Sequence, residues 1–345
     1  CVSSASATAG LRGKPLATLA DSLAAALAGA TQTLDMVAVG DIMLGRGVNN
    51  QMVGRNDYLF PYRGISDELH PADFRVANLE CMITDLVAPP TDPSTFTFIS
   101  AKKAVDGLVY AGFDTVTLAN NHANGEGPVV FQDMRDTLHS HNMLTCGGGK
   151  NLAEARTPAI KTVKGVRIAI LGYDTILPQG PFATATTWGL APIDAQTLPA
   201  DIAAARQQAD LVIPYFHWGI EYTKDPTPAQ QTPAHVAIDA GADMVLGNHP
   251  HWIQGIETYK GKLIIYSMGN FIFDQDWSEA TLEGMLLHLY WRGKTLTSVR
   301  FVATKDVSRC QPRPMTAAEA VGAFSRLWSG TDLLANGQYG PEYEP

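Results

Sequence analysis

Short apolar runs that each end in a polar cluster recur along the chain between residues 34 and 274. Segments 34–39, 74–79, 115–118, 166–171, 211–215, 244–246 and 263–266 have the length and composition of buried β-strands. Segments 102–112, 129–141, 201–209 and 230–240 lie between these runs and have helical spacing. Strands that alternate with helices favour βαβ units and mainly parallel pairing.

The pattern changes after residue 274. Segments 284–291 and 297–304 predict an antiparallel pair at the edge of a sheet. Residues 1–33 are rich in Ala, Ser, Thr and Gly, and we expect a tether there, although 15–27 could form a helix. Residues 309–345 have weak periodicity and are expected to form a peripheral extension. The main domain is therefore predicted to span residues 34–308.

Composition limits the classes of function. The chain has 345 residues, of which 46% are hydrophobic, and this is enough for one large core. The net charge of −9 argues against a nucleic-acid partner, because such binding depends on many Lys and Arg contacts to phosphate. An anionic substrate would therefore need local positive charge from metal ions or single arginines. No segment approaches the roughly 18 apolar residues that a membrane helix requires.

Four cysteines are present, and none forms a C-x-x-C pair. Cys1 is followed by VSSASATAG, which resembles a processed lipoprotein with a lipid on the cysteine and a polar linker. We therefore expect a lipid-anchored protein of the cell envelope that faces the periplasm or the outside; a trimmed fragment is the alternative. Cys81, Cys146 and Cys310 allow at most one disulfide, or each could be a buried thiol.

Side chains that can bind metal ions follow the predicted strands. In a parallel sheet they would converge at the carboxyl edge, where ligands bind in open α/β folds. Imidazole combined with oxygen ligands suits Mn, Fe or Zn, and we expect one or two divalent ions, with Mn favoured. A carboxylate that bridges two ions would create a hydrolytic centre. The residues concerned are Asp41, Arg46, Asn78, Glu80, Asn120, Asn121, His122, Asp174, His217, Glu221, Asn248, His249, His251, Asn270 and Asp274.

The individual signals differ in strength. His249 and His251 flank a proline after a strand, which favours a preorganised pair of ligands. His217 taken alone could equally be a packed core histidine. Arg46 could hold a phosphate or carboxylate in a bidentate manner, or could be an ordinary surface arginine. His122 could act as a general acid towards a leaving group rather than as a ligand.

Six ordered blocks give the chain a family resemblance. They are GDIMLGR at 40–46, ANLE at 77–80, LANNH at 118–122, FHWGIE at 216–221, GNHPHWIQ at 247–254 and YSMGNFIFD at 266–274. With these blocks the chain resembles the CapA-type poly-γ-glutamate capsule biosynthesis proteins, a family similar in fold to the calcineurin-like metallophosphoesterases. The resemblance implies an α/β fold: a four-layer α/β/β/α sandwich with mixed sheets.

The resemblance also implies roles for individual residues. Substrate contacts are expected from Arg46, Asn78, Glu221 and Asn270, and His122 would be the catalytic histidine together with Arg46. Metal ligands would be Asp41, Glu80, Asn121, His217, His249 and His251.

Three features depart from the metallophosphoesterase pattern. The second motif, normally Gly-Asp-x-x-Asp, is reduced to Asn78-Leu79-Glu80. Met43 stands where a histidine ligand is usual, and Gly125 stands where an aspartate often follows the catalytic histidine. Asn124 or Glu126 could take the place of that aspartate.

The favoured function is a metal-dependent hydrolase or transferase of the cell envelope that acts in the synthesis or export of poly-γ-glutamate or a related surface polymer. Its partners would be an anionic polymer or a phosphoester or γ-glutamyl substrate, the membrane through Cys1, and other capsule-synthesis subunits. The alternative is a non-catalytic accessory protein that binds and guides an anionic polymer. A nucleotidase-like scavenger is a weaker third hypothesis, since the sequence shows no clear second domain to bind a base.

Overall fold

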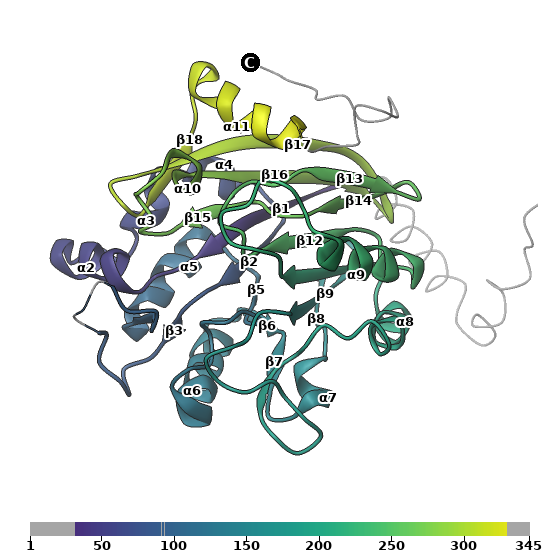
Figure 1. The fold of residues 1–345 in the computed structure, drawn as a ribbon, viewed down its shortest axis with the longest axis horizontal. Coiled ribbons are helices and arrows are strands. Elements are labelled where there is room, and N and C mark those ends of the chain that lie inside the picture. Colours follow the sequence, from purple (N-terminus) through teal and green to yellow (C-terminus); the bar gives the residue numbers. More distant parts are fainter. Residues whose placement is uncertain (1–31, 91, 93, 330–345) are drawn as a thin grey trace, which may run out of the picture.

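Two β-sheets pack face to face, and helices cover their outer faces (Figure 1). The computed structural model describes residues 32–90, 92 and 94–329. The arrangement is the four-layer α/β/β/α sandwich with mixed sheets that the sequence predicts. Within the described residues, no helix has both the length and the apolar composition needed to cross a bilayer.

The first sheet is parallel on one side and antiparallel on the other. Neighbours β1, β2, β5 and β6 pair in parallel, and β15 also pairs in parallel with β1. On the other side β16, β17 and β18 form an antiparallel extension of β1. The strands in sheet order are β18 (Gln311–Pro314), β17 (Thr295–Val307), β16 (Glu283–Arg292), β1 (Thr33–Ile42), β2 (Phe74–Leu79), β5 (Thr115–Thr117) and β6 (Leu144–Cys146), with β15 (Asn270–Ile272) beside β1.

The second sheet has a parallel centre and antiparallel edges. Strands β9, β11, β12 and β14 pair in parallel, whereas β8 and β13 pair antiparallel at the two edges. Two short pairs lie outside both sheets: β3 (Met82–Ile83) with β4 (Ile99–Ser100), and β7 (Gly148–Gly149) with β10 (Gly189–Leu190). The strands in sheet order are β13 (Ile256–Tyr259), β14 (Lys262–Ile265), β12 (Val245–Asn248), β11 (Leu211–His217), β9 (Val166–Asp174) and β8 (Ala159–Val163).

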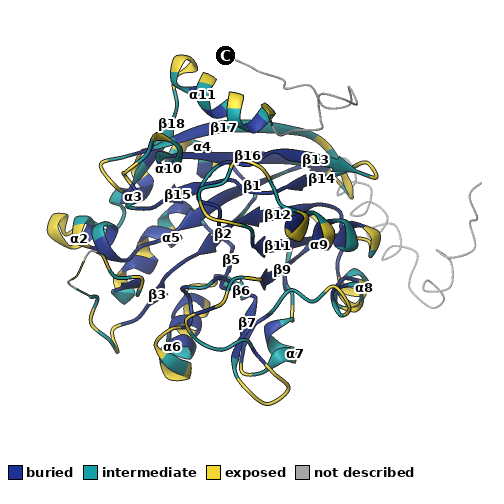
Figure 2. Cartoon of the chain, in the orientation of Figure 1, coloured by how far each residue is buried: buried dark blue, intermediate teal, exposed yellow. Residues whose placement is uncertain are grey.

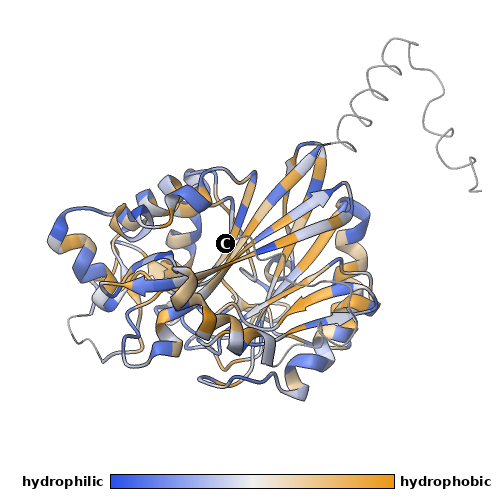
Figure 3. Cartoon of the chain, turned by 90° about the horizontal axis from the view of Figure 1, so that it is seen from above, coloured by the Kyte–Doolittle hydropathy of each residue, from blue (hydrophilic) through white to orange (hydrophobic). Residues whose placement is uncertain are grey.

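Alternation along the central strands divides the apolar residues among three cores. In β1, Met36 and Ala38 pack into the core between the sheets, while Val37 and Val39 pack against helices. Each central strand is therefore buried on both faces and appears in the sequence as an unbroken apolar run. Figure 2 shows the strands as mostly buried and the helices with exposed outer faces, and Figure 3 shows apolar residues concentrated along the strands.

The helices form the two outer layers. Those packed on the first sheet are α2 (Arg46–Arg55), α3 (Phe60–Arg63), α4 (Ser66–Leu69), η1 (Lys102–Ala104), α5 (Val105–Ala111) and α6 (Gly127–Ser140). Those packed on the second sheet are α7 (Leu152–Ala155), α8 (Leu198–Gln208) and α9 (Pro228–Asp239). Two more helices lie near β16 and β17: α10 (Glu279–Leu282) and α11 (Ala317–Ser329).

The long apolar strands were predicted well, whereas short elements were missed. Helix α2 was not expected, because its sequence RGVNNQMVGR has little apolar periodicity. Strand β18 and helix α11 lie in the segment expected to be peripheral, where β18 extends the first sheet. Cys1 and residues 2–31 of the predicted tether lie outside the described residues. Cys81, Cys146 and Cys310 are buried free thiols.

A buried imidazole joins three elements of the first sheet and helix α4. His288 on β16 is 2% exposed, and its Nδ1 lies 3.0 Å from both carboxylate oxygens of Asp35 on β1. Its Nε2 lies 3.1 Å from Glu68 Oε2 on α4, which Arg300 on β17 also contacts at 2.6 Å. Because each ring nitrogen faces a carboxylate, the doubly protonated imidazolium is the form that satisfies both.

This cluster predicts a pH-dependent contribution to stability. Burial lowers the pKa of His288, but the hydrogen bonds to Asp35 and Glu68 outweigh burial, so the net pKa lies above its ordinary value. A raised histidine pKa stabilises the folded state below about pH 6.5, and this contribution is lost as the pH rises through the folded-state pKa. We expect His288→Gln to cost about 2 kcal/mol near pH 6, and less at higher pH.

Urea titrations of both proteins at several pH values measure the difference in free energy of unfolding. The matched control is His70→Gln, since the exposed His70 ring faces no carboxylate of the described residues: its Nε2 lies 2.9 Å from Tyr110 O, and the ring packs edge-on against the Tyr110 ring. For the control we expect a difference in free energy of unfolding that does not change with pH. If the difference for His288→Gln were also constant with pH, it would contradict the imidazolium assignment.

Candidate metal centre

Both sheets direct the carboxyl ends of their parallel strands towards one region. Asp41 lies at the end of β1, Glu80 directly follows β2, and His217 is the last residue of β11. The other predicted ligands follow β5 and β12. The two halves meet directly, since Asn248 Nδ2 of the second sheet donates to Asp41 Oδ1 of the first at 2.8 Å.

A glycine allows β1 to deliver Asp41 in this position. A Cβ atom on Gly40 would lie only 1.9 Å from the carbonyl oxygen of Gly269, which precedes β15. Real Cβ contacts are never this short, so only glycine permits this approach of the two strands. The close approach also lets the Asp41 backbone N–H donate to Gly269 O at 3.1 Å.

Asp41, Glu80 and His251 form a buried group that could hold a metal ion. One ligand atom from each lies within 4.8 Å of the others, and the three residues are at most 2% exposed. Asp41 is already oriented, because Asn78 Nδ2 and Asn248 Nδ2 both donate to its Oδ1 at 2.8 Å. Glu80 Oε2 is buried and has no hydrogen-bond partner. An unsatisfied buried carboxylate oxygen is costly, and a cation at this point would satisfy it, so the residues fit a metal site.

A second group of predicted ligands lies beside the first. His217 Nε2 lies 2.9 Å from Asn121 Oδ1 and 3.1 Å from His249 Nδ1. His217 Nδ1 lies 3.7 Å from Glu80 Oε1, so Glu80 stands next to both groups. The structure therefore brings together all six residues that the sequence predicts as metal ligands: Asp41, Glu80, Asn121, His217, His249 and His251.

Electrostatics leave the imidazoles of His217 and His249 neutral. Burial lowers the pKa of His217 well below its ordinary value and lowers that of His249 to about 3. Neutral imidazole is the form that ligates metals. Burial and the nearby Asp41 carboxylate raise the pKa of Glu80 well above its ordinary value. For Asp41, burial acts in the same direction, but the hydrogen bond with His251 and the nearby His217 outweigh it and lower the pKa.

The His249-Pro250-His251 turn is held in an unusual backbone conformation. His249 has φ 99° and His251 has φ 58°, and non-glycine residues rarely adopt positive φ. The Tyr222 backbone N–H donates to Pro250 O at 2.9 Å and so supports the turn. Conformations of this kind occur where surrounding contacts enforce them, often at functional sites.

Met43 has a structural position rather than a place among the ligands. It is fully buried in the apolar core between the first sheet and its helices. Its sulfur accepts a hydrogen bond from the Gly45 backbone N–H at 3.0 Å. Asp41 and Glu80 are grouped instead with His251, which the distant 247–254 block supplies.

His122 is oriented by a backbone carbonyl, which corrects the expectation that Asn124 or Glu126 would do so. His122 Nδ1 lies 3.0 Å from Phe96 O, and Nε2 lies 3.1 Å from Asn121 Nδ2. Asn124 instead contacts Pro181 O and Gly180 N at 2.9 and 3.0 Å, and Glu126 is exposed just before α6. Burial lowers the pKa of His122 to about 3, so the ring is neutral, and donation from Nδ1 to the carbonyl leaves the Nε2 lone pair towards Asn121.

Arg46 lies near His122 but is more enclosed than expected. Its guanidinium carbon is 4.5 Å from the centre of the Phe98 ring, which also packs on His122 at 4.1 Å. The guanidinium forms an ion pair with Asp274, and Nη1 donates to Thr95 O at 3.3 Å. Arg46 Nε is buried without a partner.

The other predicted substrate contacts differ in access. Asn78 Nδ2 is fully enclosed and contacts Asp41, Glu80 and His217. Asn270 Oδ1 lies 2.9 Å from His251 Nδ1. Glu221 is 42% exposed and lies 3.8 Å from His251 Nε2, so it is the one of these three that solvent reaches.

The family assignment follows from comparison with known proteins. Residues 35–275 match the model of the bacterial capsule synthesis protein PGA_cap. The chain belongs to this family.

Relatives within this family are named as capsule proteins. The capsule biosynthesis protein CapA of Bacillus anthracis is 31% identical over 293 residues, covering 83% of this chain and 71% of the relative. The PGA biosynthesis protein CapA of Bacillus subtilis is 33% identical over 282 residues, covering 80% and 72%. A probable polyglutamine synthesis accessory protein of Mycobacterium tuberculosis is 31% identical over 170 residues, covering 46% and 45%. The resemblance that the sequence blocks indicate is thus confirmed.

Solved structures with a related chain path are more distant. The 5'-nucleotidase precursor of Thermus thermophilus has 11% identity and a TM-score of 0.45, covering 89% of this PGA_cap chain and 60% of that structure. The NAD nucleotidase of Haemophilus influenzae has 12% identity and a TM-score of 0.44, covering 87% and 57%. Nothing about the chemistry of this chain follows from a likeness this low.

Residues that sequence analysis did not assign complete the site. Gln179 Nε2 lies 2.6 Å from Phe96 O and 3.1 Å from His122 Nδ1, and no motif marks it. Tyr215 donates its hydroxyl to Val39 O at 2.8 Å, which links the two sheets. Asn248 is among the polar residues that follow the predicted strands, but sequence analysis assigned it no role, and in the structure it donates to Asp41 Oδ1.

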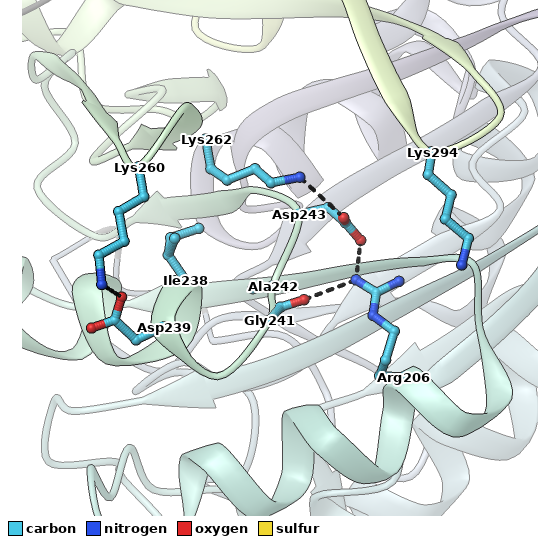
Figure 4. A pocket seen from close by; sticks show the side chains of 9 residues that line it. All are labelled: Arg206, Ile238, Asp239, Gly241, Ala242, Asp243, Lys260, Lys262 and Lys294. Atoms are coloured by element: carbon cyan, nitrogen blue, oxygen red, sulfur yellow. Dashed lines mark hydrogen bonds and ion pairs between the residues drawn. The ribbon is translucent and has the colours of Figure 1, made fainter. Parts of the chain in front are cut away.

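A pocket lies away from the candidate metal centre, at the amino-terminal ends of β11, β12 and β14 (Figure 4). Its cations are paired with carboxylates: Arg206 and Lys262 with Asp243, Lys260 with Asp239, and Lys294 with Asp210. Arg206 also donates to Gly241 O at 2.8 Å, so these pairs hold the turn after α9. We assign this cluster a structural role.

The unsatisfied oxygen of Glu80 gives a prediction with two opposite effects. Glu80→Gln removes a carboxyl group whose pKa is raised in the folded chain, which costs stability above the ordinary pKa of glutamate. We therefore expect the metal-free protein to gain about 1 to 2 kcal/mol in free energy of unfolding near neutral pH. The same change should weaken Mn²⁺ binding at least tenfold, because a charged ligand is lost. Urea titration in chelator measures the first effect, and isothermal titration with Mn²⁺ measures the second.

The matched control is Glu257→Gln, which alters a carboxylate on β13 that contacts Tyr266 and His235 outside the centre. It should not alter Mn²⁺ affinity. Equal Mn²⁺ affinity for wild type and Glu80→Gln would exclude Glu80 as a ligand.

Proposed function

We propose that this PGA_cap protein is a metal-dependent hydrolase of the cell envelope that cleaves a phosphoester during capsule polymer synthesis. The observation that carries the proposal is Glu80, a buried carboxylate with one unsatisfied oxygen, between Asp41 and His251 on one side and His217 on the other. The capsule biosynthesis relatives support the envelope location. Divalent ions at this centre, with Mn favoured, would supply a hydroxide at neutral pH and stabilise negative charge on the substrate.

The residues of the chain would divide the remaining work. Asn78 and Asn248 hold Asp41, and Asn270 holds His251, so these amides orient ligands rather than bind substrate. Asn121 contacts both His217 and His122, which couples a ligand to the catalytic histidine. Preorganised groups of this kind lower the cost of reaching the transition state.

His122 and Arg46 would act on the substrate itself. The oxygen of water forms a bond to phosphorus while the bond from phosphorus to the leaving oxygen breaks. His122 accepts the proton of water at Nε2 and transfers it to the leaving oxygen, while its Nδ1–H stays on the Phe96 carbonyl. The unpartnered Nε–H of Arg46 provides a donor for a phosphoryl oxygen.

The first test is activity. We expect purified protein with added Mn²⁺ to hydrolyse bis(p-nitrophenyl) phosphate, measured as release of p-nitrophenolate, and chelator to abolish the reaction. Fe²⁺ and Zn²⁺ are tested in parallel, because the ligand set suits all three ions. Absence of hydrolysis with every ion, in a protein that binds metal, would refute the proposal.

The second test separates His122 from the ligands. His122→Asn should lower kcat at least a hundredfold, because a positioned proton-transfer group contributes about 10²–10⁴-fold, while Mn²⁺ stoichiometry stays unchanged. The control is His139→Asn on α6, whose ring contacts Thr145 Oγ1 at 2.8 Å away from the centre. Loss of bound Mn²⁺ in His122→Asn would identify His122 as a ligand instead.

A non-catalytic role remains the second candidate, because the relative from Mycobacterium tuberculosis is named a synthesis accessory protein. In that role the chain would bind and guide an anionic polymer, with other synthesis subunits as partners. Binding of poly-γ-glutamate that persists in chelator and in His249→Ala, without hydrolysis of any ester, would favour it.

A further inference from the structure

Four exposed apolar side chains stand around the candidate metal centre. They lie on four different loops, whereas large apolar residues are normally buried or scattered singly on a surface. Their exposed fractions are 71% for Phe96, 85% for Leu177, 58% for Ile220 and 59% for Trp277.

The loops that carry these side chains contact the centre. The Phe96 backbone carbonyl lies 3.0 Å from His122 Nδ1, and Leu177 lies two residues before Gln179, whose Nε2 contacts both Phe96 O and His122 Nδ1. Ile220 precedes Glu221, which lies 3.8 Å from His251.

Trp277 lies on the side of His251. Together with Phe96, Leu177 and Ile220 it forms the set of exposed side chains that we call the rim. The Trp277 ring packs edge-on against Tyr222 at 5.9 Å, and Tyr222 stacks on His251 at 5.9 Å. The four side chains therefore belong to loops that lie beside the centre on both the His122 side and the His251 side.

The charge on these loops does not suit a polyanion. Residues 94–98, 175–188, 218–227 and 273–278 contain one cation, Lys224, which lies 4.0 Å from the Asp225 carboxylate. The same loops contain four carboxylates: Glu221, Asp225, Asp274 and Asp276. Asp276 is paired with Arg309 at 2.7 Å and Asp274 with Arg46. Glu221 stands beside His251 and has no lysine or arginine partner among the described residues. Arg46 is nearby but is enclosed and paired with Asp274. A chain of carboxylates would meet repulsion here, and it would leave the apolar side chains exposed to water.

We propose that the substrate is amphiphilic: a phosphoester whose phosphoryl group enters the metal centre and whose apolar chain lies on Phe96, Leu177, Ile220 and Trp277. This inference rests on the proposed hydrolase function and adds the substrate class. A substrate that lies on the rim must also place a group in the centre. A single phosphoryl group needs only the cations available in the centre itself. An apolar chain of at least a few carbon atoms would then remove the rim from water.

Two esters with the same scissile bond test this inference. p-Nitrophenyl methyl phosphate and p-nitrophenyl dodecyl phosphate, the latter below its micelle concentration, are assayed with the Mn²⁺-loaded full chain. We expect kcat/KM to be at least about tenfold higher for the dodecyl ester, since burying several methylene groups is worth that much. The double variant Leu177→Ser, Trp277→Ser should reduce this ratio towards one. The control Val321→Ser, an exposed apolar residue on α11, should leave the ratio unchanged.

A binding measurement gives a readout that does not need turnover. Isothermal titration with dodecyl phosphate in chelator should show saturable binding, and the double variant should weaken the affinity at least about tenfold. Methyl phosphate and poly-γ-glutamate should not compete.

The outcomes separate the two proposals. Hydrolysis of both esters at equal kcat/KM would overturn the amphiphilic substrate and leave the hydrolase intact, and the rim would then be a surface for a protein partner. Saturable, rim-dependent binding of dodecyl phosphate without hydrolysis of either ester would support the substrate class and overturn the hydrolase. Competition by poly-γ-glutamate would overturn the charge argument.

Discussion

The hydrogen bond between Asn248 and Asp41 joins the two sheets at the carboxyl ends of their parallel strands, where the predicted ligands of both sheets lie together. The first sheet supplies carboxylates through β1 and β2, and the second supplies imidazoles through β11 and β12. Neither sheet alone contains a metal site. Because the inter-sheet core is apolar, Asp41 can be buried there only if polar groups of the opposite sheet satisfy it. The packing of the two sheets therefore requires that the polar residues of the centre come together.

That requirement explains which features could be predicted from sequence. The central strands are buried on both faces, so they appear as apolar runs, and the ligands follow them directly. Asp41, Glu80, His217, His249 and His251 were predicted as ligands for this reason, and the structure places them side by side. Helix α2 and strand β18 were missed because tertiary packing, rather than local periodicity, decides their conformation. Gln179 reaches His122 from a loop that no pattern connects with it.

The backbone conformation differs most from what the sequence suggests at His249 and His251. A proline between His249 and His251 suggests a turn, but nothing in the sequence shows that both histidines have positive φ. Tyr222, which supports this turn, itself has φ 58°. Strain of about 1–3 kcal/mol at such a residue persists only where other contacts impose it. The cost is consistent with a site selected for ligand placement rather than for stability.

The carbonyl of Phe96 has a consequence for how the site responds to acid. An aspartate beside a catalytic histidine can itself be protonated, and the histidine then loses its acceptor and its tautomer preference. A peptide carbonyl does not titrate, so the Nδ1–H of His122 keeps its acceptor at any pH at which the chain stays folded. The carbonyl also carries no net charge, so it favours the imidazolium less than a carboxylate would. With Gly125 in place of an aspartate, the His122 ring is less basic but its orientation stays constant.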